Sequence, residues 1–180
     1  GPAATKYVDS MAPLIKQGLE NTTHENVRRN SAFALGHMVK ACGSNIGQEN
    51  LLQMLSWLGP LCSVASEKDQ KTGAKGADVD NAVSAVSRMI EACPGMIPLE
   101  SILPVMLGAL PLKCDVEEGE QIYTTFINLI RAQDPAALAL YPQILGSLAQ
   151  AATYASRVPD STKEKIAAWK SSMVADPAYR

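Results

Sequence analysis

The sequence predicts an all-α protein, in which about four antiparallel helix pairs stack side by side. Aromatic residues make up only 5% of the chain, and no segment shows the sustained alternation of apolar and polar residues that is typical of a strand. Apolar residues instead recur three and four positions apart, and the pattern of one segment returns further along the chain. These observations favour a helical repeat protein.

The first expected pair consists of Tyr7–Glu20 and Asn26–Cys42. Apolar residues recur at helical spacing in both segments, and a polar run over 21–25 separates them. Gly43 directly follows the second helix, and glycine adopts a left-handed helix end at the least cost. We therefore expect the second helix to end there.

The second expected pair consists of Gln48–Ser66 and Ala77–Cys93. Leucines recur along the first of these helices, and Gly59-Pro60 is expected to kink it because proline cannot donate its backbone hydrogen bond. Pro94-Gly95 ends the second helix. The segment 67–76 between the helices has no apolar periodicity, so we expect a loop there.

The last two expected pairs are Leu99–Leu110 with Glu117–Gln133 and Pro135–Tyr154 with Ser161–Val174. Asp134-Pro135 supplies the usual chemistry of a helix start, since aspartate caps free amides and proline fits the first helical position. Pro159-Asp160-Ser161 does the same for the last helix.

The second helices of the pairs share a sequence pattern. Seven residues of the segment 30–42 align with the segment 81–93 at a spacing of 51, with five identities and two conservative pairs. A further spacing of 40 aligns the segment 121–132, and the expected loop over 67–76 accounts for the difference. A two-helix unit of about 40 residues is the period of HEAT and armadillo repeats, in which stacked pairs bury a continuous core.

The sequence therefore predicts a HEAT-repeat α-solenoid in a single domain over 3–180. The expected repeat units span approximately 4–43, 48–94, 98–133 and 135–175. Gly1-Pro2 resembles the remnant of a cleaved affinity tag, so we expect it to lie outside the domain.

Two stretches resemble the importin-beta family of karyopherins, which are nuclear import receptors. Val27–Gly36 is similar to the inner helix of a HEAT repeat, and Ile97–Glu118 resembles the late repeats of the family, above all its importin-four branch. Asp78–Ala82 matches that branch too. The sequence departs from the family pattern at Cys114, where a charged residue is usual, and at Val116, where an aromatic residue is usual.

The resemblance implies a C-terminal fragment of a receptor four or five times as long, which shuttles between cytoplasm and nucleus. It also implies histones or ribosomal proteins as cargo. Ran-GTP and nucleoporins are expected partners of the full-length parent, and the early repeats that mainly bind Ran-GTP would be missing here. In HEAT architecture the second helix of each pair lines the concave side, so cargo is expected on those helices.

A polar face is expected on the second helix of each of the first three pairs, at about 100° per residue. Stacking these helices aligns Asn30, Asn81 and Gln121 in one row. Side-chain amides can pair with the backbone of an extended peptide, and carboxylates select for lysine or arginine. The predicted cargo-peptide site consists of Asn30, Phe33, Asp80, Asn81, Ser84, Glu117, Glu118, Glu120, Gln121 and Thr124.

Each of these residues also has a structural interpretation. The acidic run Asp115–Glu120 would complement the dipole at the start of a helix. Asn30 and Asn81 could be incidental surface residues, and Phe33 could pack against a neighbouring repeat. Capping a helix does not exclude binding a peptide, so both interpretations stay open for the acidic run.

Several function classes are not expected. The net charge of -2 gives no overall attraction to nucleic acid or to an anionic membrane, and no apolar stretch reaches the roughly 20 residues of a membrane span. The four cysteines have no metal-site spacing, so no metal or other cofactor is expected. His24 and His37 have no catalytic partners at motif spacing, so we expect no enzyme.

The leading hypothesis is a nuclear transport receptor fragment that binds a basic, extended cargo segment, such as a histone tail or a ribosomal-protein localisation signal. The alternative is a HEAT-repeat scaffold that docks a folded partner or an amphipathic helix. Binding to a basic peptide would weaken with salt, whereas docking on an apolar patch would not. A third possibility is that the segment only completes the parent solenoid and touches no cargo.

Overall fold

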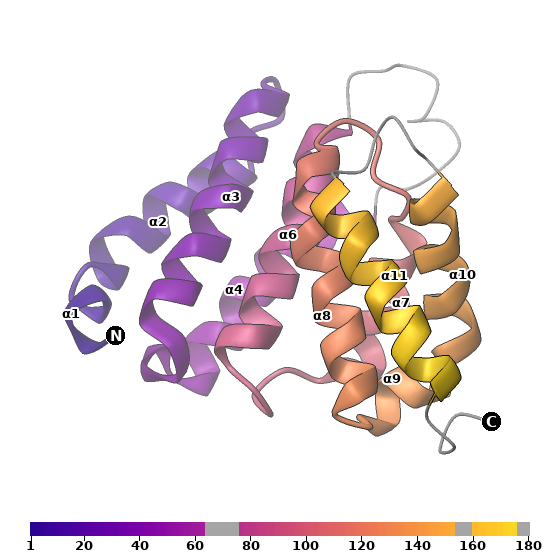
Figure 1. Ribbon diagram of the computed structural model, residues 1–180. Helices are drawn as coiled ribbons and strands as arrows, with labels where there is room; N and C mark the ends of the chain where they lie inside the picture. The colour runs from indigo at the N-terminus through magenta and orange to yellow at the C-terminus, as the bar shows by residue number, and fades with distance from the viewer. Residues whose placement is uncertain (64–75, 154–159, 176–180) are drawn as a thin grey trace.

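The computed structural model describes residues 1–63, 76–153 and 160–175, and these residues form helices and no strand. Four helices, here called the B layer, lie side by side in chain order in Figure 1: α3 (Glu25–Cys42), α6 (Ala77–Ala92), α8 (Gly119–Arg131) and α11 (Asp160–Ala175). The A layer comprises α2 (Val8–Leu19), α4 (Gln48–Cys62), α7 (Leu99–Gly108) and α10 (Tyr141–Thr153), with α2 and α10 at the left and right ends of the molecule in Figure 1. This arrangement confirms the predicted all-α stack of helix pairs.

Four short helices complete the described chain: α1 (Pro2–Thr5), η1 (Gly43–Ile46), η2 (Val116–Glu118) and α9 (Pro135–Ala139). Two of them divide segments that were expected to be single helices. The 3-10 turn η2 precedes α8, and a break at Leu140 separates α9 from α10. Pro142 fits this break, because proline lacks the backbone donor that one continuous helix would need there and is tolerated in the first turn of α10. The loop expected over 67–76 lies outside the described residues except for Gly76, as does Tyr154.

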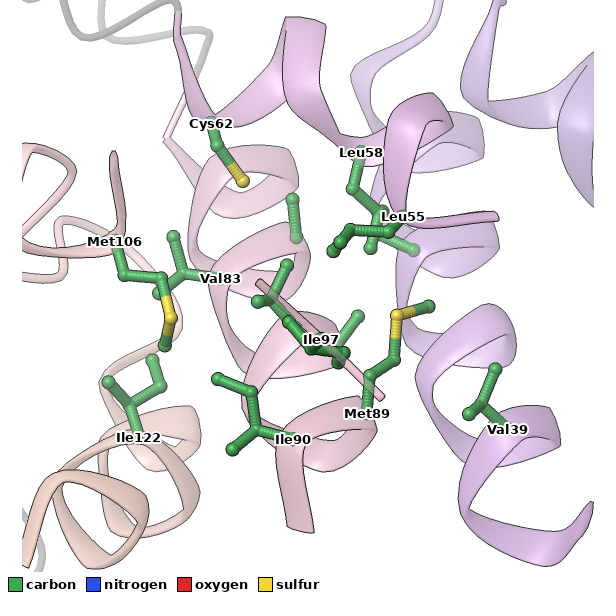
Figure 2. Close-up of a cluster of buried hydrophobic side chains, with 14 of the residues drawn as sticks. Val39, Leu55, Leu58, Cys62, Val83, Met89, Ile90, Ile97, Met106 and Ile122 are labelled. Atoms are coloured by element: carbon green, nitrogen blue, oxygen red, sulfur yellow. The ribbon is translucent and has the colours of Figure 1, made fainter. Parts of the chain in front are cut away.

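The hydrophobic core runs through the whole stack, and α6 is its central helix. Every residue of α6 from Asp78 to Ile90 is buried, because α3, α4, α8 and η2 all pack against it. Figure 2 shows side chains of α3, α4, α6, α7 and α8 that meet there, among them Val39, Met89 and Met106. Full burial on all sides makes α6 the element that fixes its neighbours.

The backbones of α3 and α6 approach each other closely at Gly36. A Cβ atom built on Gly36 would lie 2.8 Å from the Cα atom and 3.0 Å from the Cβ atom of Ala85. The Cα atom is part of the α6 backbone and the position of the Cβ atom is fixed by it, so no side-chain rotation could relieve the overlap. Only glycine therefore allows the two helices to pack at this distance.

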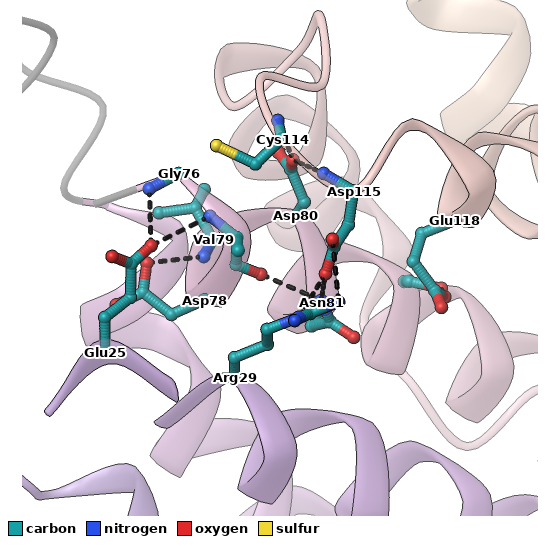
Figure 3. Close-up of polar contacts among 12 residues, drawn as sticks. Glu25, Arg29, Gly76, Asp78, Val79, Asp80, Asn81, Cys114, Asp115 and Glu118 are labelled. Carbon is teal, nitrogen blue, oxygen red and sulfur yellow. Dashed lines mark hydrogen bonds and ion pairs between the residues drawn. The ribbon is translucent and has the colours of Figure 1, made fainter. Parts of the chain in front are cut away.

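Asp80 anchors the loop that leads from α7 to α8. Its carboxylate accepts hydrogen bonds from the backbone N–H groups of Lys113, Cys114 and Asp115, with Oδ2 at 3.1, 2.7 and 2.8 Å from the three nitrogens (Figure 3). Burial raises the pKa of the Asp80 carboxyl, and the three amide donors act in the opposite direction. Asp80 is fully buried, whereas the sequence predicted it on the displayed face. Its partners are backbone amides, which no helical wheel can reveal.

Glu25 and Arg28 connect the start of α3 to the start of α6. The Glu25 carboxylate accepts hydrogen bonds from the N–H groups of Gly76 and Ala77 at 3.0 and 3.1 Å, and so caps a helix other than its own. The Arg28 guanidinium binds the Asp78 carboxylate at 2.7 Å, and both side chains are largely buried. The first turn of α6 is thus fixed by two side chains of α3.

Replacing Gly36 with alanine should destabilise the fold by about 1–3 kcal/mol, because the added methyl group overlaps the α6 backbone. Urea unfolding followed by circular dichroism measures this change. Gly146→Ala in α10 is the matched control, since a Cβ atom there meets nothing within 4 Å. The control should be stabilised by about 0.5–1 kcal/mol, because alanine favours the helix. A neutral Gly36→Ala variant would contradict the close approach of α3 and α6.

Replacing Asp80 with alanine should lower the free energy of unfolding by about 2–4 kcal/mol, because three backbone donors lose their acceptor. Asp80→Asn should lose less, since it keeps one acceptor oxygen. Glu164→Ala removes an exposed carboxylate from α11 and should change stability by less than about 0.5 kcal/mol. Equal losses in Asp80→Ala and Glu164→Ala would show that the loop does not depend on this carboxylate.

Candidate functional site

Two adjoining grooves lie on the B layer. The first has a volume of about 530 Å³ and is lined by Arg29, Asn30, Phe33, Asn81 and the residues 114–118. The second has a volume of about 270 Å³ and is lined by Arg88, Glu91, Glu117, Glu118, Glu120, Gln121, Thr124 and Lys165. Glu117 and Glu118 belong to both linings, so the two grooves form one continuous surface feature from α3 to α11.

Most of the residues predicted for the site line these grooves. Asn30, Phe33, Asn81, Glu117 and Glu118 line the first groove, and Glu117, Glu118, Glu120, Gln121 and Thr124 line the second. Asp80 and Ser84 line neither groove, and both are fully buried. Eight of the ten residues predicted from the repeat alignment therefore line the grooves, whereas the side chains of the two remaining residues, both on α6, are buried in the protein.

Asp115 lines the first groove and is bound by side chains of both α3 and α6. Arg29 donates to both of its carboxylate oxygens, with nitrogen–oxygen distances of 2.5 and 2.9 Å, and the Asn81 amide donates to the same carboxylate (Figure 3). Asn81 also donates to the carbonyl oxygen of Ala77 at 2.8 Å. The Asn81 amide group is therefore occupied, whereas Asn30 lies exposed on the same groove.

Glu118 lies at the boundary between the grooves and binds two residues of α6. Arg88 donates to its carboxylate at 2.8 Å, and the hydroxyl group of Ser84 donates to the same oxygen. Both members of the Arg88–Glu118 ion pair are mostly buried, with side-chain exposures of 9% and 15%. Removing either partner would leave a charge in a partly desolvated position, so this pair fixes η2 against α6.

Phe33 is exposed on the wall of the first groove, and neighbouring side chains already stack on its ring. The guanidinium carbon of Arg88 lies 5.5 Å from the ring centre, and the His37 ring centre lies 4.2 Å away. Burial and the positive charge of Arg88 lower the pKa of His37, so the imidazole favours its neutral form. An internal arginine thus takes the position over the ring that a cationic ligand would use.

Hydrogen bonds and an ion pair beside the second groove join α8 to its two neighbours, α6 and α11. Ser161 donates to the Glu120 carboxylate at 2.9 Å and Lys165 forms an ion pair with it, and these two donors lower the pKa of Glu120. On the other side, the Gln121 amide donates to Glu91 of α6 at 2.7 Å. Glu120 and Gln121 therefore connect three consecutive B helices.

Glu117 differs from the other acidic residues of the grooves. It is exposed, it lines both grooves, and its carboxylate has no hydrogen bond or ion pair within the described part of the chain. Across the two linings, five carboxylates face three cations. The carboxylates are Glu91, Asp115, Glu117, Glu118 and Glu120, and the cations are Arg29, Arg88 and Lys165. The grooves therefore carry a negative excess that centres on Glu117.

Sequence reasoning missed the cations that complete this site. Arg29 and Arg88 neutralise Asp115 and Glu118, whereas the sequence analysis assigned no ion-pair partner to either acid. The repeat alignment contains a clue, since a spacing of 51 places Arg29 over Asp80. Arg29 and Asp80 do not bind each other, but each binds a later repeat, Arg29 through Asp115 and Asp80 through the backbone amides of 113–115.

Neither a candidate metal-binding cluster nor a candidate membrane-spanning helix is present in the described ranges. No group of three or more histidine, cysteine, aspartate or glutamate side chains there could hold a metal ion. Of the helices that the structure describes, none is long and apolar enough to cross a membrane.

Comparison with known proteins shows that the chain is similar to importins. No protein-family model matches it. The chain is 27% identical to human importin-4 over 166 residues, which cover 92% of the chain and 14% of that protein. It is 29% identical to the probable importin subunit beta-4 of Schizosaccharomyces pombe over 146 residues, or 81% of the chain and 12% of that protein. Mouse importin-4 is 26% identical over 166 residues.

The chain spans only 12–14% of the length of these curated relatives. The relatives are named as importins and not as enzymes, which agrees with the non-catalytic interpretation of the sequence. Over most of its length the chain thus resembles a segment of importin-beta family proteins, as Val27–Gly36 and Ile97–Glu118 predicted.

Proposed function

We propose that this chain is part of a nuclear import receptor, and that the two grooves of its B layer bind a basic, extended segment of cargo. Histone tails and the localisation signals of ribosomal proteins are the cargo segments with this chemistry. The relatives support the transport role, since the proteins that the chain resembles are named importins. Shuttling between cytoplasm and nucleus, with Ran-GTP and nucleoporins as further partners, belongs to the same proposal for the whole receptor.

The observation that carries the proposal is the carboxylate of Glu117, which has no partner among the described residues and lies within a groove that has an excess of acidic residues. An exposed carboxylate next to Asp115 and Glu118 creates a local negative potential, although the whole chain has a net charge of only -2. A lysine or arginine side chain would be attracted to this point and would bring its own hydrogen-bond donors. Glu117 is therefore the expected first contact of a basic cargo segment.

The grooves also suit an extended peptide in their shape. They run continuously past α3, α6, α8 and α11, so a peptide in them would lie across the helices. The exposed Asn30 amide can pair with both the N–H and the C=O group of such a peptide, whereas the amides of Asn81 and Gln121 already bind within the protein. Backbone recognition is thus expected at Asn30, with Thr124 beside the second groove.

The remaining acidic residues would contribute less to cargo binding. Asp115, Glu118 and Glu120 each form an ion pair with a cation of the protein, so a cargo lysine could only share these carboxylates. The rival function, docking of a folded partner or an amphipathic helix, would depend little on these charges. The two functions therefore differ in how binding responds to salt and to the loss of Glu117.

Replacing Glu117 with glutamine should weaken the binding of a lysine-rich histone-tail peptide about two- to fivefold, because one exposed ion pair is lost. Isothermal titration calorimetry at low and at near-physiological salt measures the change. The wild-type affinity should also fall as salt increases, and the difference between the two proteins should shrink.

Glu100→Gln provides the matched control, because Glu100 is an exposed residue of α7 in the A layer and the change in net charge is the same. Its affinity for the peptide should equal that of the wild type. Equal weakening in both variants would show that peptide binding depends only on the net charge of the protein and not on Glu117 itself. Salt-independent binding would favour the rival function.

A further inference from the structure

One lysine of the protein itself lies in the second groove and is bound there as a basic ligand would be. Lys165 of α11 lines this groove, and its ammonium group donates to Oε1 of Glu120 on α8. The two residues are 45 positions apart, so the packing of α11 against α8 brings them together (Figure 1). A cargo lysine that enters the groove would be attracted to the same carboxylate.

Lys165 is held less firmly than the other two cations of the grooves. Arg29 donates to both oxygens of its partner carboxylate, and Arg88 belongs to an ion pair that is mostly buried. The side chains of Lys165 and Glu120 are 50% and 41% exposed, and one hydrogen bond joins them. Exposed pairs of this kind are weak, because water solvates both charges. Lys165 is therefore the cation of the grooves that a ligand displaces at the least cost.

Glu120 would keep its position after Lys165 leaves. Ser161, in the first turn of α11, donates to Oε2 of Glu120 at 2.9 Å, whereas Lys165 binds Oε1. The two bonds use different oxygens, so the loss of one leaves the other intact. Glu120 is thus an acceptor that stays in place and has Oε1 available for a new donor.

Exchange of the two lysines is favoured over sharing of the carboxylate. Two ammonium groups that both contact Oε1 would lie next to each other, and like charges at contact distance repel strongly. Lys165 loses little when it moves away, because its side chain is already half exposed and its ammonium group returns to water. A cargo lysine at Glu120 therefore gains most when Lys165 leaves.

The exchange would also enlarge the acidic centre of the groove. Glu117 and Glu120 are three positions apart, where η2 leads into α8, and both line the second groove. The Glu117 carboxylate has no partner among the described residues, and the departure of Lys165 would release Glu120 as well. A cargo segment with two basic residues would then meet two available carboxylates in place of one.

We propose that Lys165 is an internal competitor for the basic cargo of the second groove. In the free protein its ammonium group occupies Glu120, and it leaves this carboxylate when a cargo lysine binds there. The inference rests on the proposed cargo function and adds to it a residue that limits the affinity. Neutralising Lys165 therefore strengthens cargo binding.

Replacing Lys165 with methionine should strengthen the binding of a lysine-rich histone-tail peptide about two- to fivefold, because Glu120 loses its internal partner. Isothermal titration calorimetry at low salt measures the change, and circular dichroism checks that the variant is folded. Lys165→Arg keeps the positive charge and should bind the peptide no more tightly than the wild type does.

Lys170→Met is the matched control for Lys165→Met. It makes the same change in net charge at an exposed position of α11 that lies outside both groove linings, so the affinity should stay close to that of the wild type. An equal gain in the two methionine variants would show an effect of net charge and would overturn the proposal.

A Glu120→Gln background tests whether the effect depends on this carboxylate. Lys165→Met should give no further gain there, since glutamine removes the charge for which the two lysines compete. A similar gain in both backgrounds would contradict the competition at Glu120.

The outcomes separate this inference from the proposed function. Weaker binding in Glu117→Gln together with no gain in Lys165→Met would leave the cargo function standing and overturn the competition. A peptide that binds neither the wild type nor Lys165→Met would overturn both.

Discussion

The carboxylate of Asp80 is the interaction on which both grooves depend. It is fully buried in the central helix α6, and it binds three consecutive backbone amides of the segment 113–115. This segment places Asp115 in the lining of the first groove and continues into η2, which contributes Glu117 and Glu118 to both grooves. One buried acid thus positions the exposed acids, and the groove follows from an interaction in the interior of the protein.

A charged residue binds a later repeat at the equivalent position of each of the first three repeats. The repeat spacings of 51 and 40 align Arg29, Asp80 and Glu120, one residue before the row of amides. Each of the three binds a later repeat: Arg29 binds Asp115, Asp80 binds the loop amides, and Glu120 binds Ser161 and Lys165. The chemistry differs from repeat to repeat while the position stays the same. The same position of each repeat therefore makes the contact with a later repeat, whereas the residue type at that position differs.

The sequence was sufficient to predict the fold, because apolar spacing determines which face of a helix is buried. It also placed Asn30, Glu117 and Thr124 on one surface, since the repeat alignment superimposes equivalent helices. It failed for Asp80 and Ser84 because a polar side chain looks exposed on a helical wheel unless its partners are known. Those partners are backbone amides and a glutamate more than thirty positions away. Burial of polar groups depends on such distant pairs, which periodicity does not encode.

The close approach at Gly36 has a mechanical consequence for the grooves. Helices α3 and α6 touch backbone to backbone, and Glu25 and Arg28 hold their first turns together, so the walls of the first groove behave as one stiff body. The wall of the second groove that α11 supplies is held through the Glu120–Lys165 pair, with side-chain exposures of 41% and 50%. Water and salt weaken such a pair. A ligand would therefore meet a preformed surface at one end and a compliant one at the other, and the entropy lost on binding would concentrate at the compliant end.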